Sequence, residues 1–497
     1  MSMEPAASGR AAGSPGTEHV PRRAIWSWMM FDWATQPFNT LILTFVFGPY
    51  FTSVALTNES AAAFLDAVGL GFLFDPTNAE GDAGPQAVWG LIAGVTGMFT
   101  ALAAPVLGAM ADATGPRKPW IAAFSVLAIV GSIGLWALTP GAETDAILLV
   151  ALCFALAYFG FEFATVFNNA MMPDLVPRAQ LGRLSGNAWA LGYVGGLVSL
   201  VIVLGFLSTQ PGEGRTLLGL EPLFGLDPEA GEGNRATGPL TGLWYALFVL
   251  PLFVFVPDAP KRAAVKGAVA DGLRRLRTTL RTLPRQRSLF AYLGSSMFYR
   301  DALNGLYTFG GIYAAGILGW SIILLGVFGI ITALVGAIGA WIGGKLDARF
   351  GPKPVVAACV VALLLVTLVI TATDRSSVLL LPVGDVVPSI EVTLPLLGPL
   401  GTPDLVFLAC GMVIGAAGGS LQAASRTLLV DQAHPDRMTE AFGLYALSGK
   451  ATSFLAPVMV GLLTALFASQ RAGMLALAVL FLAGLALLPL VRQRDPD

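Results

Sequence analysis

The sequence predicts an all-α integral membrane protein whose twelve transmembrane helices form two pseudo-symmetric bundles of six. Three observations predict this fold class: the composition, a series of long apolar stretches, and the one-sided placement of basic residues between them. The chain has 497 residues, of which 55% are hydrophobic and only 12% charged, whereas soluble domains carry about 25% charged residues. A chain so poor in charge cannot cover its whole surface against water, so we expect the lipid bilayer to surround it.

The spanning helices follow from the apolar stretches, because a helix that crosses a bilayer needs about 20 mostly apolar residues. Suitable stretches lie near 25–53, 87–110, 119–138, 146–171, 183–207, 240–257, 289–316, 321–344, 354–373, 404–430, 440–467 and 472–491. An even number of spans places both termini on the same side of the membrane.

The basic residues predict which side that is. Of the 29 Lys and Arg residues, 22 fall on the side that holds the termini, four fall on the other side, and three lie within spans. Basic residues gather in cytoplasmic loops, so we expect a multi-pass protein with cytoplasmic N- and C-termini. In a bacterial cell its place would be the plasma (inner) membrane.

The segments between the spans suggest a domain organisation. We expect a disordered tail over 1–23, an N-terminal six-helix bundle over 24–257, a basic cytoplasmic linker over 258–288, and a C-terminal six-helix bundle with a short tail over 289–497. The loops at 58–86 and 208–239 are rich in Gly and Pro, and we expect them to be irregular. We interpret the arginines of the linker as a tether beside anionic lipid headgroups; the alternative is a docking site for a nucleotide or a protein.

Several functional classes find no support in the sequence. A net charge of −2 offers no basic surface for nucleic acid. Cys153, Cys359 and Cys410 each lie in an apolar run, so we expect no disulfide framework. No cluster of His, Cys and carboxylates has metal-ligand spacing, and we expect no metal or cofactor. We find no nucleophile–base pair and no phosphate-binding loop of the GxxxxGK[ST] type, so we expect neither an enzyme nor an ATP-driven pump.

A short loop motif occurs once in each half. Residues 108–118 (GAMADATGPRK) end the second stretch, and residues 347–354 (DARFGPKP) end the eighth. In such a loop a Gly permits a tight turn, and charged side chains at the inner face can hold one conformation and release it in another. The predicted gating residues are Gly108, Asp112, Gly115, Arg117, Lys118, Asp347, Gly351, Lys353 and Arg426. Asp347 lies four residues before its glycine and Asp112 only three, which weakens the equivalence of the two copies.

These segments resemble a known family. The loop at 108–118 is similar to the signature loop of the major facilitator superfamily. The segments at 31–34 (FDWA), 43–47 (LTFVF), 169–174 (NAMMPD) and 443–450 (GLYALSGK) resemble its vacuole-effluxer branch, which is related to the yeast autophagy-associated amino-acid effluxer. The resemblance extends from residue 25 to about 490. It implies the major facilitator fold, transport of a small-molecule substrate by alternating access, amino acids as the first substrates to consider, and a monomer. Proton coupling is not implied, because the Gly-Pro antiporter signature is absent from the fifth helix.

Ionisable groups within the spans mark the candidate binding site. They are Asp32, Glu162, Arg300, Asp301, Arg426 and Lys450. Each costs about 2.5–3.5 kcal/mol at bilayer depth, so such groups tend to face the protein interior or a wet cavity. With polar neighbours at helical spacing, they give the predicted substrate-binding or coupling residues Asp32, Gln36, Asn39, Glu162, Asn169, Arg300, Asp301, Asn304, Gln422 and Lys450. Asp301, Asn304 and Thr308 make one such stripe on the seventh helix.

These residues suggest a polar or zwitterionic substrate. Arg300, with Lys450, would hold a carboxylate, and Asp32 or Glu162 would hold an ammonium group or carry a coupling proton. Arg300 and Asp301 are about 100° apart on a helix, so we expect only one of them to face the ligand. The alternative is a set of structural ion pairs with no ligand role, and Arg426, near the cytoplasmic end, suits a structural or gating pair. A second functional class also stays open: a non-transporting sensor or scaffold that keeps the transporter fold.

Overall fold

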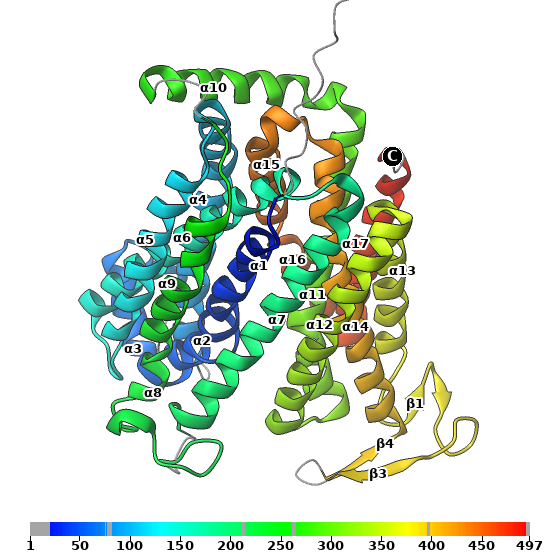
Figure 1. Cartoon of the computed structure of the whole chain (residues 1–497). Helices are drawn as coiled ribbons and strands as arrows, with labels where there is room; N and C mark the ends of the chain where they lie inside the picture. Colours follow the sequence, from blue (N-terminus) through cyan, green and yellow to red (C-terminus); the bar gives the residue numbers. More distant parts are fainter. Residues whose placement is uncertain are drawn as a thin grey trace, which may run out of the picture.

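The computed structural model describes residues 20–74, 76, 82–209, 214–260, 265–394 and 398–493. The predicted disordered tail therefore lies, up to residue 19, outside the described residues. Two helical bundles stand side by side (Figure 1). Buried apolar side chains form one core cluster within 28–256 and a second within 289–491, which Val166 and Ala170 join. We name the elements around these clusters the N-terminal bundle and the C-terminal bundle.

The N-terminal bundle contains short elements as well as spanning helices. Its elements are α1 (Arg22–Pro37), the π-helix η1 (Phe38–Phe45), α2 (Phe47–Tyr50), η2 (Phe51–Ala55), α3 (Asn58–Ala67), α4 (Ala83–Thr114), α5 (Lys118–Gly134), α6 (Thr144–Met171), α7 (Leu181–Phe206), α8 (Glu232–Arg235) and α9 (Thr237–Phe255). The first span runs from α1 through η2.

The first span widens in its middle because of a proline. Pro37 has no backbone N–H and cannot continue the regular ladder, and the following turns of η1 are wider. At the end of η1 the N–H of Val46 donates to the carbonyl of Leu41, five residues earlier, at 3.1 Å. Such π-helical turns occur frequently at functional sites, and this one carries Asn39, Thr40 and Thr44 to the bundle interface.

The C-terminal bundle follows α10 (Val265–Thr282), which lies across one end of the molecule. Its elements are α11 (Arg287–Leu318), α12 (Ile322–Phe350), α13 (Pro352–Thr371), β1 (Ser377–Val378), β2 (Leu381–Pro382), β3 (Glu391–Leu394), β4 (Gly398–Gly401), α14 (Thr402–Gln432), α15 (Met438–Ala451), α16 (Leu455–Phe467) and α17 (Gln470–Leu487). We name the end that carries α10 the linker face and the end that carries β3 and β4 the hairpin face. The C-terminal end lies at the linker face (Figure 1).

Eleven helical segments of the described chain are long and apolar enough to cross a membrane. The remaining long helix is α11, which has 32 residues. Its polar residues, Arg300, Asp301 and Asn304 among them, lower its hydropathy. The prediction of an all-helical membrane fold is confirmed. Helix α11, which is less apolar because of these residues, contributes side chains to the cavity between the bundles.

Regular structure forms in segments between the predicted spans, and it includes the short helix α8 within the loop 208–239 that was expected to be irregular. The segment 58–86 was expected to be irregular, but α3 forms there because Thr57 and Ser60 cap its first turn reciprocally, at 3.0 and 3.2 Å. Its Phe64 and Leu65 are buried. Between α13 and α14, two antiparallel strand pairs, β1–β2 and β3–β4, form at the hairpin face. The expectation that 58–86 is irregular was therefore wrong, and the strand pairs between α13 and α14 were not predicted.

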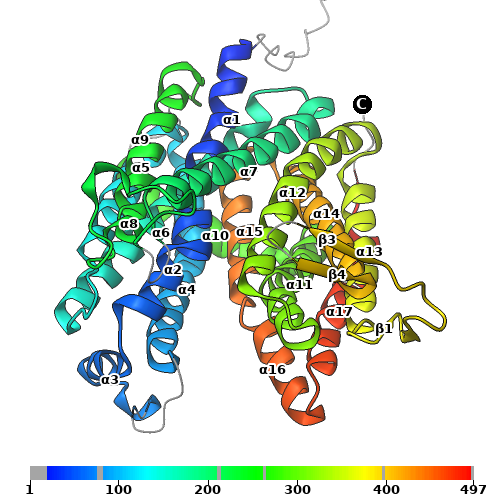
Figure 2. The same ribbon diagram turned by 90° about the horizontal axis from the view of Figure 1, so that it is seen from below.

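The two bundles touch most closely at the linker face, where small residues let backbones meet. A Cβ atom on Gly108 of α4 would lie 3.1 Å from the Cα of Glu440, and one on Gly443 of α15 would lie 2.9 Å from the Cα of Pro105. Helix α7 likewise packs on α12, as the view from below shows (Figure 2). Close contact of this kind requires small residues at the interface.

Candidate functional site

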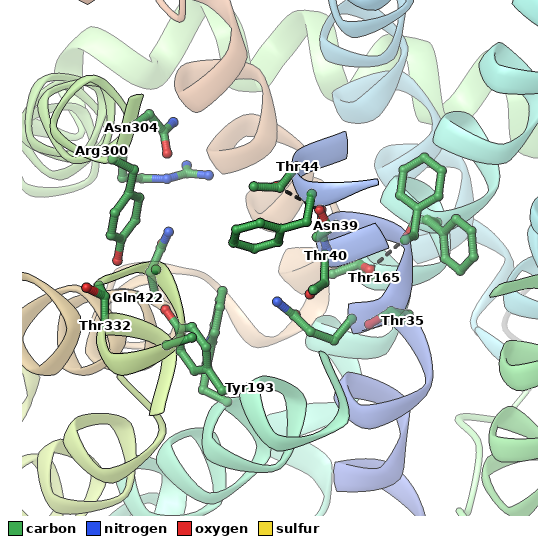
Figure 3. A pocket seen from close by; sticks show the side chains of 18 of the residues that line it. Thr35, Asn39, Thr40, Thr44, Thr165, Tyr193, Arg300, Asn304, Thr332 and Gln422 are labelled. Carbon is green, nitrogen blue, oxygen red and sulfur yellow. Dashed lines mark hydrogen bonds between the residues drawn. The ribbon is translucent and has the colours of Figure 1, made fainter. Parts of the chain in front are cut away.

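A cavity of about 670 Å³ lies between the bundles. This volume falls in the range of about 300–1,000 Å³ that small-molecule sites occupy. Its lining comes from α1, η1, α6 and α7 on one side and from α11, α12, α14 and α15 on the other. Figure 3 shows Asn39, Thr40 and Thr44 on one side of this space and Arg300 and Asn304 on the other.

The cavity opens toward the hairpin face. The side chains near its linker-face end are almost inaccessible, with Arg426 4% and Asn169 9% exposed. Those toward its other end are more accessible, with Phe45 42% and Tyr307 41% exposed. A solute can therefore enter from the hairpin face and meets a closed floor toward the linker face.

Arg426 of α14 forms that floor by reaching into the N-terminal bundle. Its guanidinium lies 3.0 Å from the carboxylate of Asp32 and donates to the side-chain oxygen of Asn169 at 3.1 Å. It also donates to the hydroxyl of Ser185 at 3.0 Å and to the Ser185 carbonyl at 2.9 Å. The ring of Trp189 lies beside it, 5.3 Å from the guanidinium carbon. Arg426 thus forms an ion pair between the bundles, and its gating role stays a prediction.

A second ion pair crosses the cavity between α15 and α6. The ammonium of Lys450 lies 3.1 Å from the carboxylate of Glu162, and each side chain is 28% exposed. Lys450 also donates to the hydroxyl of Tyr158. This pair lies nearer the middle of the helices than the Arg426 pair, and both residues line the cavity.

Arg300 of α11 is held differently. Its guanidinium donates to the backbone carbonyl of Tyr445 at 2.9 Å and lies over the Tyr445 ring at 4.0 Å. No carboxylate of the described residues forms an ion pair with Arg300. A stacked guanidinium keeps its planar donor edge fixed, which suits recognition of a carboxylate.

Asp301 lies outside the residues that line the cavity. It is 1% exposed, and its carboxylate accepts a hydrogen bond from the backbone N–H of Ala456 at 3.0 Å, in the first turn of α16. The cavity face of α11 carries Arg300, Asn304 and Tyr307. The predicted stripe of Asp301, Asn304 and Thr308 was therefore right for Asn304 and wrong for Asp301 and Thr308, which lie one position, or about 100° around the helix, from Arg300 and Tyr307. As expected, only one of Arg300 and Asp301 faces the cavity.

The other predicted residues come together. Those that line the cavity are Gln36, Asn39, Glu162, Asn169, Arg300, Asn304, Gln422, Arg426 and Lys450, and Asp32 lies directly behind Arg426. The aromatic part of the lining was not predicted; it includes Phe38, Phe161, Tyr193, Phe328 and Tyr445. Aromatic residues are also common in packing between helices. The one sequence signal for these residues is therefore that they lie beside the polar stripes of the same helices.

The first copy of the loop motif joins the bundles at the linker face. Asp112 accepts hydrogen bonds from the backbone N–H groups of Thr439 and Glu440 at 3.2 and 2.8 Å, and so caps the start of α15 in the other bundle. Arg117 donates to the Thr439 hydroxyl at 3.2 Å and lies 2.6 Å from Asp174.

The second copy behaves differently. Asp347 accepts a hydrogen bond from the hydroxyl of Thr427, within its own bundle. Both turn glycines have positive φ, +96° at Gly115 and +84° at Gly351, but Asp347 lies four residues before its glycine, whereas Asp112 lies three before its own. The ion pair that crosses the interface here is Arg178 with Asp431, at 2.9 Å.

The lysines of the motif stabilise helix ends within their own bundles. Lys118 donates to the carbonyl of Phe253 at 3.0 Å, at the end of α9, and Lys353 donates to the carbonyl of Val491 at 2.6 Å, beyond α17. Cations favour helix C-termini. Neither of these bonds crosses the bundle interface. Asp258 was not among the predicted residues; it caps α5 by accepting hydrogen bonds from the N–H groups of Arg117 and Lys118 at 2.8 and 3.0 Å.

Comparison with known proteins gives the family context. The family model described as "Vacuole effluxer Atg22 like" matches residues 86–372 and 400–495. The MFS-type transporter YxiO of Bacillus subtilis is 23% identical over 468 residues, which is 94% of each chain. Autophagy-related protein 22-2 of Aspergillus clavatus is 24% identical over 313 residues, which cover 60% of this chain but only 46% of the fungal protein.

Solved structures share the fold. The proton:xylose symporter XylE matches with a TM-score of 0.61 and 13% identity, over 96% of each chain. The major facilitator transporter FucP, solved in the outward conformation, matches with a TM-score of 0.59 and 15% identity, over 96% of this chain and 100% of its own. At such identities the likeness concerns the fold alone.

Proposed function

Because this chain belongs to the vacuole effluxer Atg22-like family of major facilitator transporters, we propose that it moves a small polar solute across the membrane by alternating access. The observation that supports this best is the cavity between the bundles, which is open at one end and closed at the other by contacts between bundles. Amino acids are the first solutes to test, since the resemblance to the vacuole effluxers implies them. A transporter of this family is not an enzyme.

The orientation is part of the proposal. With the linker face in the cytoplasm, as the distribution of Lys and Arg predicts, the described state opens to the outside and is closed at the cytoplasmic face. Arg274, Arg277 and Arg281 of α10 are exposed at that face, where anionic headgroups would attract them.

The contacts that close the floor join residues of different bundles. Opening toward the linker face must break the Arg426–Asp32 pair and release the start of α15 from Asp112. A solute that favours the opposite state shifts the equilibrium only by its differential affinity for the two states. These contacts therefore set how readily the empty protein changes state.

Proton coupling would use one of the two carboxylates at the cavity. Glu162 is the better candidate, because it is 28% exposed whereas Asp32 is 13% exposed beside Arg426. A proton on Glu162 would break its pair with Lys450 and so change the charge at the middle of the cavity.

The experiment is uptake and counterflow in proteoliposomes with a panel of amino acids, peptides, organic acids and sugars, with and without a pH gradient. Saturable transport of a panel member by the wild type is expected. A sensor or scaffold would bind a solute and carry none. Glu162→Gln tests the coupling: if its transport rate and pH dependence equal those of the wild type, Glu162 does not carry the proton.

A further inference from the structure

The charges that face the cavity do not balance. Three cations, Arg300, Arg426 and Lys450, line it. Two of them are neutralised across the bundle interface, Arg426 by Asp32 at 3.0 Å and Lys450 by Glu162 at 3.1 Å. Arg300 is left without a carboxylate among the described residues.

Asp301 cannot supply the missing charge, although it is the next residue in the chain. It is 1% exposed and faces the start of α16, where it accepts from the N–H of Ala456. The cavity therefore carries one positive charge that no carboxylate of the described residues neutralises. This charge lies among the predicted binding residues. An uncompensated charge in the membrane interior is costly, and a bound anion would compensate it.

The surroundings of Arg300 suit a carboxylate. The guanidinium lies over the ring of Tyr445 and donates one hydrogen bond to the Tyr445 carbonyl, which leaves other N–H groups free for a ligand. Gln422 and Asn304, whose amides can donate further bonds, line the same cavity as Arg300 (Figure 3). Hydrogen bonds between a guanidinium and a carboxylate are about twice as strong as neutral ones.

Part of the remaining lining is aromatic. Phe38 and Phe161 stack at 4.5 Å between ring centroids on the N-terminal side, and Phe328 and Phe442 contribute from the C-terminal bundle. Rings of this kind can bury the apolar body of a ligand. Uncharged polar side chains, which include Asn39, Thr40 and Thr44, line another part of the cavity.

We propose that the solute is an organic monoanion, a carboxylate with an apolar or aromatic body, bound with its carboxylate on Arg300. This rests on the proposed transport function and names its substrate class. A zwitterion could also place a carboxylate on Arg300. Its ammonium group, however, would need an acid, and both acids at the cavity already hold a cation of the other bundle.

Three probes of one shape test the role of charge. 3-Phenylpropanoate is an anion, L-phenylalanine is a zwitterion with the same ring and chain, and 2-phenylethylamine is the matching cation. Binding is measured by calorimetry on the full chain in lipid nanodiscs. We expect 3-phenylpropanoate to bind at least about tenfold more tightly than L-phenylalanine, because the ammonium group of L-phenylalanine would be buried without an acid partner, and 2-phenylethylamine not to bind.

Two variants that each remove one cation provide the contrast. Arg300→Gln should abolish the preference for 3-phenylpropanoate, and Arg300→Lys should restore part of it. Lys450→Gln leaves Arg300 in place and frees Glu162, so it should raise the affinity for L-phenylalanine relative to 3-phenylpropanoate. Size-exclusion profiles and melting temperatures identify a variant that has not folded, and Arg300→Lys then serves as the comparison.

The proposal is overturned if wild-type protein binds L-phenylalanine as tightly as 3-phenylpropanoate, if Arg300→Gln keeps the preference, or if no probe binds. Those results would leave the proposed function intact as long as the proteoliposome panel shows transport of another solute. The proposed function itself fails only if the panel shows no transport at all.

Discussion

The guanidinium of Arg426 on α14 lies 3.0 Å from the carboxylate of Asp32 on α1, so an ion pair joins the two bundles at the floor of the cavity. The two residues are 394 positions apart in the chain. Their side chains are 5% and 13% exposed, so breaking the pair leaves a charge in a poorly hydrated place.

Asp32→Asn should weaken the described state strongly. Removing one partner of a buried pair costs about 3–5 kcal/mol, and the free Arg426 charge would remain at the floor. We expect a lower melting temperature and a fall in the initial uptake rate of at least about tenfold. The control is the double variant Asp32→Asn with Arg426→Gln, which should regain stability; equal stability of the single and double variants would show that the pair contributes nothing.

Gly108→Ala should separate α4 from α15, because a Cβ there would lie 2.9 Å from the carbonyl carbon of Thr439. Ala111 on α4 is fully buried and can be replaced by Cys as a reporter. A membrane-impermeant thiol reagent should label this Cys faster in the Gly108→Ala background than with Gly108 in place. Gly90→Ala on the same helix is the matched control, since nothing lies within 4 Å of its Cβ position. Equal labelling rates in the two variants would argue against a tight contact at Gly108.

Asp301→Ala should lower stability without changing recognition. Its carboxylate caps α16 through Ala456, and loss of a cap costs about 0.5–2 kcal/mol. We expect a lower melting temperature with a KM close to that of the wild type, whereas Arg300→Gln should change KM at nearly constant stability. A large change in KM for Asp301→Ala would return Asp301 to the binding site.

The two copies of the loop motif should respond differently to the same change. Asp112→Ala removes the cap that holds α15 from the other bundle, so the linker face should open more often, as thiol labelling at that face can measure. Asp347→Ala removes an acceptor of Thr427 in its own bundle, so we expect reduced stability with little change in labelling. Similar labelling in both variants would mean that Asp347 also acts across the interface.

The sequence predicted the membrane fold and most of the cavity, because charges are rare enough in spanning helices that each one is informative. Glu162, Arg426 and Lys450 were recognisable as cavity residues for this reason, and Asp32 as the partner of a cavity residue. Helical spacing could not decide the face of α11, where Arg300 and Asp301 are adjacent and both stripes contain Asn304. Packing against α16 decided it.

Other features depend on partners far away in the chain. Lys450 pairs with Glu162 and Arg426 pairs with Asp32, so Arg300 has no carboxylate partner among the described residues. No local sequence pattern predicts which of these charged residues form pairs. Asp258 caps α5 from about 140 residues away, at the end of another helix. The capping box at Thr57 could have been recognised in the sequence, but the Gly and Pro residues that follow it favoured the prediction of an irregular loop.

The central claim is that the bundles alternate between this state and one that is open at the linker face. Spin labels on the exposed residues Ala179 and Arg349 report the linker face, and labels on Ser53 and Ser321 report the hairpin face, in a variant without native cysteines that still transports. Electron–electron double resonance in nanodiscs should give two populations for each pair. When a transported solute is added, the linker-face distance should lengthen as the hairpin-face distance shortens; fixed distances in both pairs under all conditions would contradict the account.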